Sequence, residues 1–373
     1  MSWNVLIGLE KEKKLLQKAI LENKIASAYC FLGLEGIGKD AFALEFAKTV
    51  NCYAPIKNNN SIIACDNCKS CKMANQISHP NIQYLFPQPA TEKLKEEEIS
   101  SIKLELKSKI ENPYHKINIP NARQIHIGLI RNVIKNMIFS DQNKGRRFII
   151  ISSGDAMNTE AANAFLKTLE EPQINTTIII TSSKREKLLQ TILSRCQQIY
   201  FSPLSNEDVA KYLMQNNQKT ETEANLIAAM SQGSITQAVD FLDDDINYMR
   251  NLAVEVLRIS LKKIKYRVDF LNEINKIIEK KDKKNMVLFL NLLLLWLRDV
   301  YSIHITASTE NVANKDLLER MINFNKGFPQ ANYLEACSKI EMAISRINRN
   351  IDPVLTYVSL FIELRRIFVG FAF

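Results

Sequence analysis

The stretch AYCFLGLEGIGKDAFALEFAKTV, residues 28–50, decides the fold. Residues 28–32 form a short apolar run that predicts a buried strand, and residues 41–50 show the apolar spacing of a helix. Between them, residues 33–40 form a glycine-rich turn. A strand, a glycine turn and a helix in this order predict an α/β unit that begins with a phosphate-binding loop.

The turn, GLEGIGKD, fits the first seven positions of the phosphate-loop pattern G-x-x-x-x-G-K-[ST]. Glycines such as Gly33, Gly36 and Gly38 let backbone N–H groups surround phosphate oxygens. The helix N-terminus adds partial positive charge, and Lys39 would reach the outer phosphates. The pattern therefore predicts a loop built for ATP.

The eighth position of the pattern is Asp40, where a Ser or Thr hydroxyl normally ligates Mg²⁺. The next buried strand, residues 148–151, should lead to an Asp-Glu pair that holds the metal, but Ser152 and Ser153 follow instead. Asp155 comes later, and we expect it to point elsewhere. These two departures predict weak nucleotide binding and poor hydrolysis at this loop.

The remaining chain is predicted as strands and helices first, then helices alone. Residues 147–151 and 176–181 are apolar or β-branched runs separated by a helical segment at 158–169, so we expect a parallel sheet with helices on both faces. After Ser205 the periodicity is helical to the end of the chain. The sequence, at 373 residues, has room for two or three domains.

Composition adds little about function. The net charge of +9 fits an acidic partner such as nucleic acid, and it fits solubility equally well. We see no secretory signal segment at residues 1–7, and the most apolar stretch, residues 286–297, is too short to span a bilayer. We therefore expect a cytoplasmic protein with a buried helix at 286–297.

Four cysteines fall within one polar segment: Cys52, Cys65, Cys68 and Cys71. Their spacing, C-x12-C-x2-C-x2-C, predicts a tetrahedral Zn²⁺ site of four thiolates. The alternative is four free thiols in a loop. His79 is near, but the fourth cysteine completes the set, so we expect a structural zinc without an open position. Cys30 and Cys337 have apolar neighbours and are predicted core residues.

The turn Ser194-Arg195-Cys196 follows the third predicted strand and a short helix. An arginine at a helix end commonly satisfies carbonyl groups or forms a surface ion pair. The functional alternative is an arginine finger, which offers its guanidinium to a neighbour's γ-phosphate. The turn by itself leaves both interpretations open.

The string AANAFLKTLEEP, residues 161–172, resembles the A-x-N-A-L-L-K-x-L-E-E-P helix of the bacterial clamp loaders, a family of AAA+ ATPases. The phosphate loop, the cysteine module and the Ser-Arg-Cys turn follow in that family's order, and SAY at 27–29 resembles its usual lead-in. The resemblance is dense over residues 1–203. Weaker similarity lies further on, in WLRD at 296–299 and RNIDP at 349–353.

The family contains two kinds of subunit that share the cysteine module and the Ser-Arg-Cys turn. Motor subunits keep the loop and the acidic pair intact, whereas in the other kind both are degraded. Asp40 and Ser152-Ser153 match the degraded kind. At residues 233–238, where the family's nucleotide-sensing arginine is expected, the sequence has Thr and Gln. The resemblance thus implies no intrinsic ATPase activity, and it leaves ATP or ADP binding open.

The resemblance also implies partners and domains. The complex is a pentamer of one delta subunit, three gamma/tau motor subunits and one subunit of the degraded kind. It loads the ring-shaped sliding clamp onto primed DNA as part of the DNA polymerase III holoenzyme. Arg195 would serve the ATP of a neighbouring subunit. We expect an AAA+ domain at 1–203 with the zinc module at about 52–71, a helical lid at 204–243 and a helical collar at 244–373.

Two other functions remain possible from the sequence. One is a self-sufficient, gamma/tau-like motor ATPase that uses Asp40 or Asp155 for Mg²⁺. The other is a zinc-containing nucleic-acid binder outside any clamp loader, which would leave the string at 161–172 unexplained. The charged stretch at 88–120 is long for this place in the family. We expect a surface excursion there, with a solvated helix or disordered chain at 91–111 and no assigned function.

Overall fold

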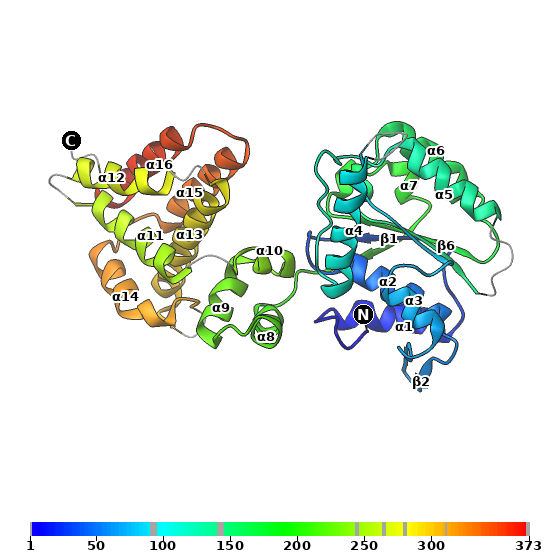
Figure 1. Ribbon diagram of the computed structural model, residues 1–373. Coiled ribbons are helices and arrows are strands. Elements are labelled where there is room, and N and C mark those ends of the chain that lie inside the picture. Colours follow the sequence, from blue (N-terminus) through cyan, green and yellow to red (C-terminus); the bar gives the residue numbers. More distant parts are fainter. Residues whose placement is uncertain are drawn as a thin grey trace. The chain divides into compact units, whose positions relative to one another are not determined.

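The computed structural model describes residues 2–89, 95–139, 145–242, 246–262, 266–278, 282–309 and 312–370. The chain forms two compact units. Unit 1 comprises Met1–Tyr212 and Gly233–Gln237, and unit 2 comprises Leu213–Gln232 and Ala238–Phe373 (Figure 1).

Unit 1 is built on a five-stranded parallel sheet in the order β4-β5-β6-β1-β7. The strands are β1 (Ala28–Leu32), β4 (Ile82–Leu85), β5 (Arg147–Ile151), β6 (Thr176–Ser182) and β7 (Gln197–Tyr200). Tyr29 of β1 is in register with Ile179 of β6 on one side and with Gln197 of β7 on the other. Because β1 is flanked on both sides, the loop that follows it emerges from the interior of the sheet.

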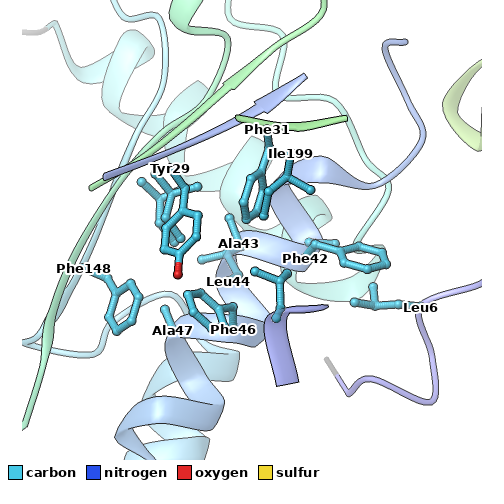
Figure 2. Close-up of a cluster of buried hydrophobic side chains, with 14 of the residues drawn as sticks. Leu6, Tyr29, Phe31, Phe42, Ala43, Leu44, Phe46, Ala47, Phe148 and Ile199 are labelled. Atoms are coloured by element: carbon cyan, nitrogen blue, oxygen red, sulfur yellow. The ribbon is translucent and has the colours of Figure 1, made fainter. Parts of the chain in front are cut away.

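Alternate residues of β1 bury against helices on opposite faces of the sheet. Tyr29 and Phe31 pack with the helices α1 (Glu10–Leu21) and α2 (Lys39–Asn51), where Phe42 and Phe46 complete an aromatic core (Figure 2). On the other face, Ala28, Cys30 and Leu32 pack toward α6 (Thr159–Glu170) and α7 (Gln190–Leu193). Each fully buried aromatic side chain contributes about 1.5–3 kcal/mol. The expected parallel sheet with helices on both faces is confirmed.

Unit 1 also contains shorter elements, several of them outside the predicted pattern. They are the hairpin β2 (Ile56–Asn58) and β3 (Ser61–Ile63), the helices α3 (Lys69–Asn75), α4 (Glu96–Glu111) and α5 (Ile127–Phe139), and the 3-10 turns η1 (Gly154–Ala156) and η2 (Arg185–Lys187). The charged stretch forms a helix, α4. The prediction that it is a solvated excursion is wrong at its C-terminal end, because Lys109, Tyr114 and Ile119 are buried.

The described residues of unit 2 form helices joined by turns and irregular segments, with no strand among them. Its helices are α9 (Glu221–Met230), α11 (Ile246–Ser260), α12 (Tyr266–Ile278), α13 (Lys283–Thr306), α14 (Leu318–Gly327), α15 (Tyr333–Asn348) and α16 (Pro353–Val369), with a 3-10 turn η3 (Lys315–Leu317). Two more helices, α8 (Asn206–Asn217) and α10 (Ile235–Asp240), have residues in both units. α13 packs against α11, α14 and α15 and forms the centre of the unit. Cys337 is buried on α15, as predicted.

The helix α13 is longer than the sequence indicated. It has 24 residues, and by length and composition it is apolar enough to cross a membrane. However, 67% of its most apolar window is buried inside the protein, which is the environment of a core helix. The predicted buried helix is therefore present, although the argument from its shortness is wrong. The boundary expected between residues 243 and 244 lies outside the described residues, and the three-part division remains a prediction.

Candidate functional site

The phosphate-loop sequence joins β1 to α2 and takes its shape from glycines. Gly38 has φ +97°, and a Cβ there would lie 2.7 Å from Cε1 of Tyr114. Gly36 has φ +79°, and a Cβ there would lie 2.2 Å from Oγ of Ser234. Both the left-handed backbone and the close neighbours therefore require glycine at these positions. The carbonyl of Gly36 also accepts N–H bonds from Ile235 (3.0 Å) and Thr236 (3.4 Å).

Lys39 bonds to its own loop. Its Nζ donates to the carbonyl oxygens of Gly33 (2.9 Å) and Leu34 (2.5 Å), and the residue is 7% exposed. Burial lowers the pKa of Lys39, and the carboxylates of Asp40 and Glu35 oppose that shift. The ammonium group that would reach outer phosphates in an ATPase is thus engaged by carbonyl groups of the same turn.

Asp40 is surrounded by hydroxyl donors. Its Oδ2 accepts from Ser152 Oγ (2.6 Å) and Tyr84 Oη (3.0 Å), and its Oδ1 accepts from Thr181 Oγ1 (2.6 Å). Burial by itself would raise the pKa of Asp40, but the Lys109 charge and these hydroxyls outweigh burial and lower it. The ionised carboxylate is therefore stabilised by three hydroxyl donors. Tyr84 lies in β4, Ser152 directly follows β5, and Thr181 lies in β6.

The two sequence departures meet in space. Asp40 and Ser152 are separated by 112 residues, yet their side chains share a short hydrogen bond. Ser153 follows in a left-handed conformation (φ +55°), and its N–H donates to Thr181 Oγ1 at 3.3 Å. Asp155 accepts from Ser182 Oγ at 2.8 Å and thus takes no direct part in the Asp40 cluster. The place where an ATPase holds Mg²⁺ is occupied here by a hydroxyl–carboxylate cluster.

A cavity of about 300 Å³ adjoins this cluster. Its wall includes the loop, the ends of β5 and β6, Asp155, and a group of residues between Lys109 and Arg123. Sequence reasoning found the loop, Ser152 and Ser153. It missed Tyr84, Thr181, Lys109 and Tyr114, and only Tyr114, an aromatic after Pro113 in a charged stretch, carried any local signal.

The four cysteines of the predicted zinc site lie together. Their sulfur atoms all lie within 4.8 Å of one another, with Cys52–Cys65 at 3.5 Å and Cys65–Cys71 at 4.0 Å. A tetrahedral Zn²⁺ with bonds of about 2.3 Å separates its sulfurs by about 3.8 Å, so this set fits the metal. Although burial opposes ionisation, N–H donors from Cys71 and Tyr53 lower the pKa of the Cys68 thiol to about 6.

Buried polar contacts connect the cysteine cluster to α2. Lys48 on α2 pairs with Glu45 (2.8 Å) on the same helix and with Asp66 (2.5 Å) between two of the cysteines. Ser70 Oγ donates to the Asn51 carbonyl at 2.6 Å.

His79 lies in the same region but is not part of the sulfur cluster. It is buried, and its Nε2 lies 3.0 Å from Ser70 Oγ while its Nδ1 accepts from the Asn81 N–H. With both ring nitrogens engaged in this way, His79 supports the module and leaves the ligand set to the four cysteines.

Arg195 lies at the surface of unit 1. Its Nη1 donates to the Thr191 carbonyl (2.9 Å) and its Nη2 to Oε1 of Glu170 (2.6 Å). The Arg195 side chain is 35% exposed and that of Glu170 is 48% exposed. Among the described residues that line the cavity at the loop, Arg195 does not appear. Its guanidinium is therefore partly exposed at the surface and is held by one carbonyl and one exposed carboxylate.

Comparison with known proteins places these residues in a family. The sequence profile described as "DNA polymerase III, delta subunit" matches residues 8–205, more than half of the chain. The chain is 25% identical over 354 residues to the DNA polymerase III subunit delta' of Bacillus subtilis, which covers 94% of this chain and 95% of that protein.

Two further relatives match shorter parts of the chain. The delta' subunit of Pseudomonas aeruginosa is 30% identical over 173 residues, 46% of this chain and 42% of that protein. The tau subunit of B. subtilis is 27% identical over 249 residues, 65% of this chain and 37% of that protein. The loop, the cysteine cluster and Arg195 all lie inside the range that the family profile matches.

Proposed function

The chain belongs to the DNA polymerase III delta subunit family, and we propose that it works as the delta-prime subunit of a clamp loader. In this role it helps to load the sliding clamp onto primed DNA and hydrolyses no ATP itself. The similarity to the delta' subunit of B. subtilis covers nearly the whole length of both chains, so the assignment rests on more than the phosphate loop.

The hydrogen bond between Asp40 and Ser152 carries the proposal. In active P-loop ATPases, the residues at these two places bind Mg²⁺ and its water. Here they bind each other, with Thr181 and Tyr84 completing the cluster. Lys39 is likewise engaged by loop carbonyls. We therefore propose that ATP is not hydrolysed at this loop and that neither ATP nor ADP is needed there.

Arg195 is proposed as an arginine finger that acts in trans. Its partial exposure and its single exposed side-chain partner support a role toward a neighbouring subunit. In the complex it would stabilise the charge that develops on the neighbour's γ-phosphate. The present partner, Glu170, is exposed, and an exposed ion pair of this kind contributes about 0–1 kcal/mol. Replacing the Glu170 carboxylate by a phosphate as the partner of Arg195 therefore costs little free energy.

The cysteine cluster is proposed to hold a structural Zn²⁺ through Cys52, Cys65, Cys68 and Cys71. Four sulfur ligands leave no open position for a substrate or water. The metal would hold the hairpin β2–β3 and α3 against the end of α2, where the Lys48 and Ser70 contacts already lie.

We propose partners and domain roles on the same basis. The partners are gamma/tau motor subunits and a delta subunit in a hetero-pentamer, together with the sliding clamp and primed DNA reached through the complex. Residues 1–203 form the AAA+ domain, 204–243 the lid and 244–373 the collar that joins the subunits. For such a replication subunit we propose a cytoplasmic location.

Assembly tests this function directly. The full chain is co-purified with gamma/tau and delta subunits, and the mass of the complex is measured. We expect one copy of the chain in a stable complex with several motor subunits. A chain that stays alone contradicts the assignment, and steeply salt-dependent DNA binding by that lone chain would indicate a separate nucleic-acid binder.

A motor ATPase is the second candidate, because the tau subunit of B. subtilis also matches 65% of the chain and Asp155 lines the cavity beside Asp40. The two functions differ in the activity of the purified chain. We expect no ATP turnover without motor subunits. Turnover that is abolished by Lys39→Ala would favour the motor function instead.

A further inference from the structure

The charged stretch that follows β4 covers the phosphate loop. Its C-terminal part, residues 105–118, includes the last turns of α4 and the chain beyond it. Within this covering segment, Lys109 is 4% exposed and Tyr114 is 2% exposed. Both line the cavity at the loop. A segment of this charge density would be solvated if nothing in the fold bound it.

Tyr114 lies directly against the loop and is held from several sides. Its ring takes the space beside Gly38, where even a Cβ would approach to 2.7 Å. Its hydroxyl accepts from the Ile7 N–H at 2.7 Å, and its carbonyl accepts from Thr236 Oγ1 at 2.6 Å. The Tyr212 ring packs on it at 5.4 Å between centroids. The ring therefore lies against the N-terminus of α2, the part of a working loop where phosphates bind.

Lys109 places a positive charge in the cavity that Asp40 also lines. Its Nζ donates to the carbonyls of Pro113 (2.8 Å) and His115 (2.7 Å), which fixes the ammonium at the end of α4. Burial lowers the pKa of Lys109, and the Asp40 carboxylate opposes that shift. In return, Lys109 is the strongest charge that favours the ionised form of Asp40. A fixed ammonium thus stands near the group that takes the place of a metal-binding hydroxyl.

Two further contacts fasten the covering segment. Lys116 forms an ion pair with Glu35 of the loop. Glu105 Oε2 accepts from the Asn118 N–H at 2.9 Å and lies 2.8 Å from His115 Nε2, which ties the segment back onto α4. The segment therefore contacts the loop at Glu35 and beside Gly38, and its ammonium lies in the cavity that Asp40 lines.

We propose that residues 105–118 are an internal ligand of the phosphate loop. Tyr114 takes the space beside the α2 N-terminus, and the Lys109 ammonium is a fixed cation in the cavity that Asp40 also lines. The loop is thereby held in one conformation without nucleotide. This is a property of the chain itself, so its failure would leave the proposed place in a clamp loader standing.

Amide hydrogen exchange of the full-length chain tests the proposal. We compare peptides that cover residues 33–42 and 105–118 in the wild type, in Lys109→Met and in Tyr114→Ala. Lys107→Met is the matched control, because Lys107 is on the same helix and its side chain is 73% exposed. We expect exchange at least about tenfold faster in both peptides for the two test variants, since loss of a charged hydrogen bond (Lys109→Met) or of a buried aromatic ring (Tyr114→Ala) each costs more than the roughly 1.4 kcal/mol that corresponds to tenfold. The control should match the wild type.

Slow exchange in β5 serves as the folding reference for each variant. Lys109→Met keeps the side-chain length, so it carries the test if Tyr114→Ala unfolds. Wild-type exchange in both peptides of both folded variants would overturn the proposal.

The wild-type chain gives an independent second measurement with a fluorescent ATP analogue and Mg²⁺. We expect no binding and unchanged exchange in residues 105–118. Micromolar binding, or faster exchange in that segment on adding the analogue, would also overturn the proposal.

Discussion

The phosphate loop and the Ser194-Arg195-Cys196 turn belong to one unit, but their charged groups are held in opposite ways. Lys39 and Asp40 are bound by carbonyls and hydroxyls of the same chain, with several contacts of 2.5–2.9 Å. Arg195 has one backbone carbonyl and one exposed carboxylate, and a third of its side chain meets solvent.

The two regions differ in the free energy needed to make their charged groups available to a ligand. A charged group that is satisfied inside the fold must break several bonds before it can serve a ligand, and each broken bond to a charged group costs about 1.5–3 kcal/mol. A group held by an exposed ion pair gives up about 0–1 kcal/mol. The charged groups of the loop are thus part of the internal structure, whereas freeing Arg195 costs less, as its proposed role in trans requires.

The largest expected effect is on Arg195. In a complex with motor and delta subunits, Arg195→Ala should lower ATP hydrolysis at the motor site that it faces by about 10³–10⁵-fold, because an arginine finger is typically worth that much. Steady-state and single-turnover hydrolysis, measured on the assembled complex with primed DNA, would show the loss. The isolated variant should be as stable as the wild type.

Arg185→Ala is the control for this change, since Arg185 is an exposed arginine of the same unit. It should leave hydrolysis unchanged. Normal turnover at every motor site with Arg195→Ala would mean that the exposed turn has no more catalytic role than the sealed loop, and the comparison would fail.

Removal of the proposed zinc should destabilise the part of unit 1 that carries the phosphate loop and should leave the Ser194-Arg195-Cys196 turn unchanged. The cysteine cluster lies at the C-terminal end of α2, whose N-terminal end carries the loop. Cys71→Ser should lower the free energy of unfolding by more than about 3 kcal/mol, and so should removal of the metal by unfolding the chain in the presence of a chelator. Loss of a structural metal is among the largest effects that a single change has on stability.

Metal analysis of the purified chain provides the check, with one zinc per chain as the expected value. Cys337→Ser is the control, because Cys337 is a core cysteine of the other unit. Its zinc content should match that of the wild type. A chain that contains no zinc and has the same stability with Cys71→Ser would refute the site.

The central strands of the fold were predictable for a physical reason. β1, β5 and β6 are buried on both faces, so their sequences are continuous apolar or β-branched runs. The edge strands β4 (IQYL) and β7 (QQIY) were missed. Each has four residues with polar side chains among them, which is too short for alternation to separate a strand from a loop.

The candidate site likewise contains residues that local sequence patterns identify and residues that only the fold brings together. The loop and the cysteines are contiguous or closely spaced in sequence, so local patterns identify them. The bond between Asp40 and Ser152 joins residues 112 positions apart, and no local pattern contains it. Lys109 was misread because its sequence neighbours are charged and predict exposure, whereas the fold around the loop decides its burial.

A double-mutant cycle measures the interaction energy between Asp40 and Lys109. Asp40→Ser restores the usual loop residue but leaves the Lys109 ammonium without its carboxylate, so we expect a loss of about 1–3 kcal/mol in the free energy of unfolding. Lys109→Met should cost a similar amount. The double variant should lose less than the sum, because the two groups interact. Strict additivity would show that Lys109 and Asp40 are independent.

The same carboxylate predicts a smaller effect of pH. The pKa of Asp40 is lowered in the folded protein, so its stabilising contribution is complete above the unfolded value of about 3.9 and is lost as pH falls through the folded value. As pH falls below about 4, Asp40→Ser should therefore lose less stability than the wild type. Urea unfolding at several pH values measures the difference, and parallel curves would contradict it.

Glu170 gives the smallest expected effect and the sharpest test of the exposed turn. Glu170→Gln removes the carboxylate that holds Arg195, and stability should change by less than about 1 kcal/mol. Because this carboxylate competes with the neighbour's phosphate, hydrolysis in the complex should be unchanged or faster by up to about fivefold. Glu171→Gln, at the next exposed position, is the matched control. A fall in hydrolysis with Glu170→Gln, and none with the control, would mean that the ion pair persists in the complex and aims Arg195. The turn would then be internally fixed like the loop, and the contrast between the two regions would not hold.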